Sequence, residues 1–316
     1  MSNLRSLPRD AEILAARGSK NRVDPQVAWA ALVEPERTAA GTIADVATIF
    51  LTNRECPLRC LMCDLWKNTT DDPVPPGAIP TQIDRALARL PAAQQVKLYN
   101  SGNFFDPLAI PPEDYAAIAQ RLRGFGNVIV ENHPRMCTSD CLRFRDLLKT
   151  GLEVALGLET VHAESLAALN KRMTVADFDR AARFLRAEGI AVRAFILLRP
   201  PLMSEEEGIE WVLASVRHAF DAGADCCSII PTRAGNGIME RLARDGLFEP
   251  PRLASLQRVL EQGIALRRGR VFIDLWDAQR LAACSRCGPE RIERLRQMNL
   301  CQQVLPQIDC DCEAAR

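Results

Sequence analysis

Short runs of β-branched and other apolar residues alternate with amphipathic segments along most of this chain. Six of the runs are too apolar for one face to lie in water, which is typical of strands buried inside a parallel sheet. They cover residues 46–51, 96–100, 127–131, 152–157, 192–198 and 225–230. Because helical patterns separate them, the alternation predicts an α/β sheet or barrel.

The segments between these runs have the residue spacing of helices with one apolar side. We expect helices at residues 81–90, 112–124, 139–150 and 175–188. The last has clear boundaries, because Thr174 and Asp177 have the spacing of a capping box and Gly189 supplies the stop. Together these elements predict a partial (β/α)6 TIM-type barrel over residues 43–240.

The two ends of the chain are less regular. We expect residues 1–42 to form an N-terminal helical extension and residues 241–316 a C-terminal extension. Within the latter, residues 253–267 have a helical pattern and residues 271–275 form a candidate seventh strand. Residues 284–312 form a cysteine-rich tail.

Composition narrows the class of protein. Forty basic residues balance forty acidic ones, so no overall positive field would attract nucleic acid or an anionic membrane. The first twenty residues lack an apolar run of signal-peptide length, and no later run approaches the ~18 apolar residues of a membrane span. We therefore expect a soluble, cytoplasmic protein that does not associate with membranes.

Three cysteines lie close together directly after the first predicted strand. Cys56, Cys60 and Cys63 form a CxxxCxxC loop in a chain with twelve cysteines and no secretory signal, which favours metal ligation. Three thiolates can ligate three irons of a cubane and leave the fourth iron open for a chelating substrate. The alternative is structural zinc, which needs a fourth ligand from a distant residue such as His133 or Cys137.

On a (β/α) scaffold, this loop resembles the defining motif of the radical S-adenosylmethionine (radical SAM) superfamily, over roughly residues 43–240. The resemblance implies a [4Fe-4S] cluster and S-adenosyl-L-methionine as cofactors, with an electron donor such as flavodoxin or ferredoxin. It also implies that reductive cleavage yields a 5′-deoxyadenosyl radical, which abstracts hydrogen from an organic substrate. Met62 stands where the family usually has an aromatic residue, and we expect it to pack against the adenine.

Two further segments correspond to conserved parts of the family's pattern, and the first departs from it. The family usually has a Gly-Gly-Glu-like segment after its second strand, where this chain has Asn100, Ser101, Gly102 and Asn103. Without the acid, backbone carbonyls or an asparagine side chain would receive the ammonium of S-adenosylmethionine. A Gly-Leu-Glu pattern ending at Glu159 is similar to that of tRNA-modifying members, including the Elongator catalytic subunit, and makes Glu159 a candidate contact for the ribose or substrate.

Four segments resemble most closely the family that contains the archaeosine-synthesis radical SAM lyase. They are residues 51–70, 97–107, 228–233 and 246–253. This resemblance implies a lysine-modified deazaguanine base in tRNA as the substrate. Two alternatives stay open: the same chemistry on a small metabolite, which the neutral charge balance favours, and a non-catalytic protein that binds zinc or a cluster.

Residues that directly follow barrel strands share the catalytic face, which nominates several more side chains. Glu131 and His133 are candidate catalytic groups for handling a proton, although His133 would equally serve as a turn cap. Arg199 is a candidate clamp for a carboxylate or phosphate, with an ion pair on the rim as the alternative. Thr232 is a candidate cofactor contact.

The C-terminal tail holds five cysteines. Such a concentration is unusual for packing alone and indicates a second metal site, either structural zinc or an auxiliary [4Fe-4S] cluster. Its candidate ligands are Cys284, Cys287, Cys301, Cys310 and Cys312. The spacing does not choose between the two metals.

Overall fold

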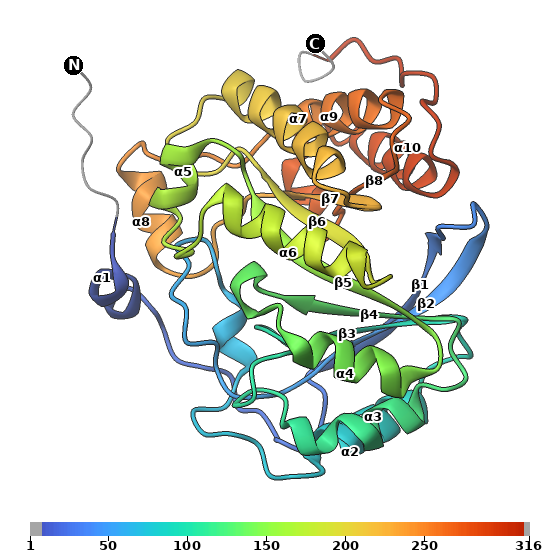
Figure 1. The fold of residues 1–316 in the computed structure, drawn as a ribbon. Coiled ribbons are helices and arrows are strands. Elements are labelled where there is room, and N and C mark those ends of the chain that lie inside the picture. The colour runs from blue at the N-terminus through green and yellow to red at the C-terminus, as the bar shows by residue number, and fades with distance from the viewer. Residues whose placement is uncertain (1–7, 313–316) are drawn as a thin grey trace.

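A curled eight-stranded sheet forms the centre of the molecule in the computed structural model, which describes residues 8–312 (Figure 1). The strands follow one another in chain order across the sheet. They are β1 (Ala30–Arg37), β2 (Ile43–Phe50), β3 (Gln95–Tyr99), β4 (Asn127–Asn132), β5 (Gly151–Glu159), β6 (Ala191–Leu198), β7 (Cys226–Pro231) and β8 (Arg270–Ile273). Strands β2 to β8 are parallel, and β1 is antiparallel to β2. The predicted α/β partial barrel is confirmed.

Helices cover the outer face of this sheet (Figure 1). They are α2 (Ala78–Leu87), α3 (Tyr115–Arg121), α4 (Ser139–Leu148), α6 (Val175–Ala187), α7 (Glu205–Asp221) and α9 (Leu253–Ala265). The strands between them are buried, as the runs of apolar residues predict; in β5 every residue except the first is buried. Since the strands are parallel, their carboxyl ends lie at one edge of the half-barrel, and the loops that follow them share that mouth.

Shorter elements complete the chain. They are α1 (Asp10–Ala15), α5 (Ala163–Ala168), α8 (Ile238–Arg244), α10 (Gly288–Cys301) and the 3-10 turns η1 (Leu65–Asn68), η2 (Pro112–Asp114), η3 (Pro134–Met136) and η4 (Ala278–Leu281). The candidate strand at 271–275 is confirmed as β8, and the helix expected at 253–267 as α9. Within residues 8–312, we find no helix with the length and apolar character needed to cross a membrane.

The N-terminal extension differs from the expectation that it is helical. Among residues 8–42 only α1 is a helix, and residues 30–37 form β1, which pairs with β2 along its whole length. The strand contains Ala, Leu and Glu, which favour helices in isolation, but pairing with an exposed sheet edge overrides such preferences. Pro35 is tolerated because β1 is an edge strand.

A buried network of charges closes the amino end of the half-barrel. Arg193 of β6 contacts Glu153 of β5 and Glu36 of β1, both at 2.6 Å. Lys97 of β3 also pairs with Glu36, and Arg270 of β8 with Glu153 at 3.1 Å. Burial alone would raise the pKa of the Glu36 carboxyl, but Arg193 and Lys97 lower it well below its usual range. Because each charge is paired, this end of the barrel is suited to holding the strands together.

Candidate active site at the mouth of the barrel

The cysteine loop lies between β2 and η1, at the mouth. The residues Cys56, Cys60 and Cys63 are all partly buried and carry free thiols. The loop turns back on itself, since the backbone N–H of Cys63 donates to the carbonyl of Cys60 at 3.2 Å. The predicted position of this loop after a strand of the half-barrel is therefore observed.

Two asparagines from distant parts of the chain hold the loop in shape. The Nδ2 atom of Asn236 donates to the carbonyls of Leu61 at 2.8 Å and Cys63 at 3.1 Å. Asn170 Nδ2 donates to the carbonyl of Arg59 at 2.7 Å. Asn236 lies between β7 and α8 and was not among the residues expected from sequence. Nothing in its local sequence indicates a partner so far away along the chain.

A small apolar cluster packs behind the loop. Leu61 is fully buried among Ile13 of α1 and residues of α8 and its following turn, namely Ile238, Met239, Leu242 and Phe248. Met62 packs against the same cluster and is only partly buried. The two helices α1 and α8 thus lie together at the loop, on the same side of the molecule (Figure 1). Contact between Met62 and an adenine remains a prediction.

The segment after β3 lies against the first cysteine. Asn103 Nδ2 donates to Cys56 Sγ at 3.3 Å. A Cβ atom on Gly102 would lie 3.4 Å from the Cβ of Cys56, so a larger residue at position 102 would crowd the loop. Asn100 is fully buried, and neither polar atom of its side-chain amide has a hydrogen-bond partner within the described residues. The structure therefore brings this predicted segment and the cysteine loop together.

Glu131, the next predicted residue, lies beneath that segment. Its Oε1 accepts from the backbone N–H of Asn100 at 2.6 Å and of Gly102 at 3.4 Å, and the N–H of Ser101 also bonds the carboxyl. Burial raises the pKa of Glu131 to about 7, against the lowering effect of these hydrogen bonds. The carboxyl thus stabilises the backbone turn formed by residues 100–102.

Both ring nitrogens of His133 form hydrogen bonds with backbone groups. Nδ1 accepts from the N–H of Arg135 at 3.1 Å, so Nε2 carries the proton and donates to the carbonyl of Lys171, also at 3.1 Å. Burial, together with the nearby Lys171 ammonium, lowers the pKa of His133 to about 4. These contacts are those of a turn cap, which was the alternative to a catalytic role for His133.

A buried ion pair lies at the end of β5. Glu159 has a φ of +62° at a bulge in the strand and pairs with Lys171, and both side chains are less than a tenth exposed. A Cβ at position 157 would collide with the Lys171 ammonium and the Glu159 carboxylate, so a larger residue there would force this pair to shift. Burial raises the pKa of the Cys60 thiol and of the Glu131 carboxyl, and the Lys171 charge lowers both pKa values in part. Lys171 was not expected as a site residue.

Arg199 follows β6 and Thr232 follows β7. The polar groups of their side chains differ in whether they have partners. Arg199 pairs with Glu205 at 2.8 Å and Glu249 at 2.7 Å and donates to the carbonyl of Pro250 at 3.0 Å. These contacts match the ion pair on the rim, which was the alternative to a role for Arg199 as a substrate clamp. The Thr232 hydroxyl is buried and has no hydrogen-bond partner among residues 8–312.

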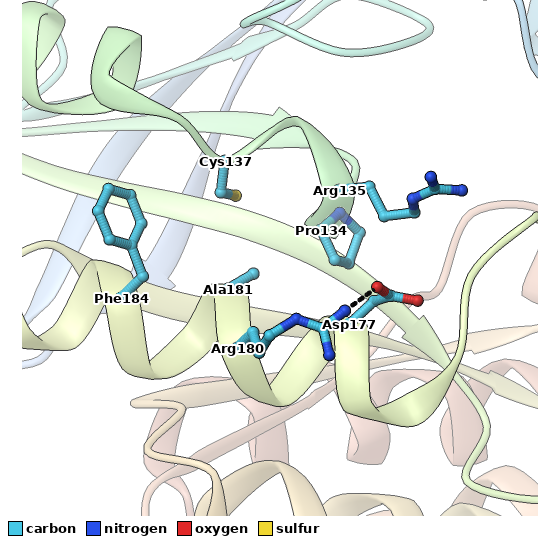
Figure 2. A pocket seen from close by; sticks show the side chains of 7 residues that line it. All are labelled: Pro134, Arg135, Cys137, Asp177, Arg180, Ala181 and Phe184. Atoms are coloured by element: carbon cyan, nitrogen blue, oxygen red, sulfur yellow. Dashed lines mark hydrogen bonds and ion pairs between the residues drawn. The ribbon is translucent and has the colours of Figure 1, made fainter.

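A separate hollow of about 330 Å³ lies between η3 and α6 (Figure 2). It is lined by Pro134, Arg135, Cys137, Asp177, Arg180, Ala181 and Phe184. Arg180 and Asp177 pair with each other at its edge (Figure 2). Its lining contains none of the residues that surround the cysteine loop, so it is not part of the candidate active site.

The arrangement of strands and cysteine loop can be compared with solved structures. Methylornithine synthase aligns with a TM-score of 0.54 at 18% identity, over 84% of this chain and 73% of that one. Elp3 of the archaeon Methanocaldococcus infernus aligns with a TM-score of 0.50 at 15% identity, over 70% of this chain and 58% of that one. Both are radical SAM enzymes. The fold is that of radical SAM enzymes.

Sequence relatives are consistent with this fold. Archaeosine synthase subunit beta of Methanosarcina acetivorans is 27% identical over 271 residues, which span 80% of this chain and 78% of the relative. The subunit of the same name from Thermococcus kodakarensis is 29% identical over 193 residues, which span 58% and 59% of the two chains. No family model matches the sequence. The resemblance to radical SAM enzymes is confirmed.

Proposed function

We propose that the chain binds a [4Fe-4S] cluster through Cys56, Cys60 and Cys63 and binds S-adenosylmethionine beside it. The observation that carries this proposal is the set of three thiols on a loop whose backbone is held by Asn236 and Asn170. Three ligands leave one iron of a cubane open. Structural zinc fits less well, because His133, one of the two candidates for the fourth ligand, already uses both ring nitrogens for backbone contacts.

The residues around the loop fit a polar cofactor. Asn100 and Thr232 follow β3 and β7, so both lie at the mouth, and both have buried polar atoms that lack partners within the described chain. A buried polar group without a hydrogen bond costs about 1–3 kcal/mol, which a bound ligand would recover. We propose that these side chains contact S-adenosylmethionine, with the backbone of residues 100–103 receiving its ammonium group.

When bound, the cluster and S-adenosylmethionine supply reductive cleavage of the sulfonium and abstraction of hydrogen from an organic substrate. The chain itself positions these groups. Glu131 fixes the turn at residues 100–102, and Asn103 donates a hydrogen bond to Cys56 Sγ. Glu159, oriented by Lys171, is the proposed contact for a ribose or substrate hydroxyl. An external donor such as flavodoxin or ferredoxin would deliver the electron.

For the substrate, we propose a modified nucleobase in tRNA. Two relatives named archaeosine synthase subunit beta support this class, one of them aligned over 80% of the chain. A small metabolite is the second candidate, since forty basic and forty acidic residues give no net field for nucleic acid.

The two substrate classes can be separated by two measurements on anaerobically reconstituted protein. A gel shift with total tRNA should appear at low salt and weaken as salt rises, because phosphate contacts release counterions. Adding tRNA should also raise the yield of 5′-deoxyadenosine over protein with S-adenosylmethionine and reductant alone. Cleavage without any tRNA binding at low salt would overturn the nucleic-acid proposal and favour the small metabolite.

A further inference from the structure

Four of the five tail cysteines converge at the start of α10. Cys284 and Cys287 precede the helix, and Cys310 and Cys312 come from the chain that follows it. Their four sulfur atoms all lie within 4.8 Å of one another, and Cys287 Sγ lies 3.6 Å from Cys312 Sγ. No other group of three or more metal-binding side chains within residues 8–312 is as close.

We propose that these four thiols form a mononuclear zinc site. Zinc binds thiolate sulfur at about 2.3 Å in a tetrahedron, which places the sulfurs about 3.8 Å apart. In an auxiliary [4Fe-4S] cluster each sulfur would bind a different iron and stand outside the cube, so the four sulfurs would be spread more widely. The observed spacing therefore fits a single ion. The site is independent of the cysteine loop and of the proposed function.

Hydrogen bonds and a cation support the ligands. The backbone N–H groups of Arg286 and Cys287 donate to Cys284 Sγ, and that of Cys312 donates to Cys310 Sγ. The guanidinium of Arg286 lies 3.7 Å from Cys310 Sγ and also pairs with Asp311. Four thiolates around Zn²⁺ leave two net negative charges, which such donors offset. On binding, each thiol releases its proton to solvent.

Cys301, which the sequence included among the candidates, is not part of this group. It ends α10, and its thiol donates to the carbonyl of Gln303 at 3.6 Å. Zinc in a structural site needs four ligands, and the other four cysteines supply them. Cys301 therefore provides a matched control for experiments on the site.

The zinc would tie the segment that follows α10 to the start of that helix. Figure 1 shows α10 beside α9 and β8. Beyond α10 the chain passes Arg294, whose guanidinium donates to the carbonyls of Leu305 at 2.5 Å and Pro306 at 2.6 Å. Gln307 then bonds Glu261 of α9 at 2.8 Å. The ion would close the segment between Cys287 and Cys310, and α10 in turn bonds β8 through Asn299 at 2.9 Å. Its role is to hold the tail against α10, which itself bonds β8 and α9.

The test is metal analysis of the full-length chain. We use a variant with Cys56, Cys60 and Cys63 changed to alanine, so that iron at the loop is removed. We expect about one zinc per chain, and zinc X-ray absorption showing four sulfurs at about 2.3 Å. Adding Cys310→Ser and Cys312→Ser should abolish the zinc, whereas adding Cys301→Ser should leave it unchanged.

Three results would overturn the proposal. They are reconstituted wild-type protein with iron sufficient for two clusters and no zinc, metal-free protein with a disulfide among the four cysteines, and zinc that persists in the Cys310→Ser, Cys312→Ser variant. X-ray absorption on wild-type protein decides the ligand set even where that variant fails to fold. Since these measurements read metal content and ligand atoms and not reaction products, none of these outcomes depends on radical chemistry.

Discussion

The hydrogen bond from Asn103 to Cys56 is the most direct influence of a single side chain on the proposed cluster. Donors to cluster sulfurs stabilise the more negative, reduced state and raise the reduction potential. A hydrogen bond of about 0.5–1.5 kcal/mol corresponds to roughly 20–60 mV for one electron. We therefore predict that Asn103→Leu lowers the potential by about this amount.

This shift can be measured by redox titration without S-adenosylmethionine, so that cofactor binding does not contribute. Asn21→Leu is a suitable control, because the Asn21 side chain bonds Asn68 at 2.7 Å. An Asn103→Leu potential equal to that of wild type would show that the hydrogen bond does not act on the cluster.

Gly157 provides a second test at the residue scale. A Cβ at this position would collide with the buried pair of Glu159 and Lys171. We predict that Gly157→Ala destabilises the protein by about 1–3 kcal/mol, the usual cost of overpacking a core. Urea unfolding of the metal-free protein should show this loss, while Gly124→Ala, which has open space around it, should stay within about 0.5 kcal/mol of wild type. Equal stability of the two variants would contradict the close approach of the ion pair to position 157.

At the scale of elements, the connection between β7 and α8 holds the cysteine loop through Asn236. Asn236→Ala removes two hydrogen bonds to the carbonyls of Leu61 and Cys63 and leaves those groups unsatisfied. It also removes the bond that the Asn236 Oδ1 accepts from the N–H of Met239 in α8. We predict a lower iron content after reconstitution, with the fold retained. The control variant Asn299→Ala removes two hydrogen bonds to the backbone of β8, away from the loop, and should keep full iron content. Normal iron loading in Asn236→Ala would show that the loop holds its shape without this contact.

The 3-10 turn η3 depends on His133, which gives it a defined pH dependence. The pKa of His133 is about 4 in the folded protein, below its ordinary value of 6.5. As pH falls from 6.5 toward 4, the unfolded chain binds a proton that the native state does not, so stability falls by up to about 3 kcal/mol. This stability is complete above pH 6.5.

Glu131 acts in the opposite direction, because its raised pKa of about 7 costs stability as pH rises from 4.5. A comparison with His133→Asn isolates the histidine, since asparagine can still accept from the N–H of Arg135. Wild type should lose about 2–3 kcal/mol relative to this variant between about pH 7 and pH 4.5. A difference that does not change with pH would contradict a buried, neutral His133.

Local patterns predicted the elements that carry their own signals. The apolar runs predicted six strands near their observed bounds, and the capping box at Thr174 marks the start of α6. In contrast, β1 was missed, because several of its residues favour a helix in isolation and its strand conformation depends on pairing with the edge of β2. Helix α10 was missed because its buried side includes Arg291 and Arg294 and so has no continuous apolar stripe.

At the scale of the whole molecule, the sequence predicts those residues of the candidate site that lie at the ends of barrel strands. Parallel strands bring the carboxyl ends of β2, β3 and β4 to one mouth, so the cysteine motif at Cys56, the segment ending at Asn103, and Glu131 were expected to lie near one another. Lys171 and Asn236 were not, because their partners lie in other loops and no local pattern records such pairings. Arg199 was nominated by position, yet its charge is used in ion pairs on the rim.

The central claim is that the loop of Cys56, Cys60 and Cys63 holds the cluster that cleaves S-adenosylmethionine. The most direct measurement is the yield of 5′-deoxyadenosine from anaerobically reconstituted, reduced protein, compared between wild type and Cys60→Ala. We predict product in wild type and a loss of at least about 100-fold in the variant, because two thiolates cannot hold an active cluster. Equal yields from the two proteins would contradict the assignment of this loop as the catalytic centre.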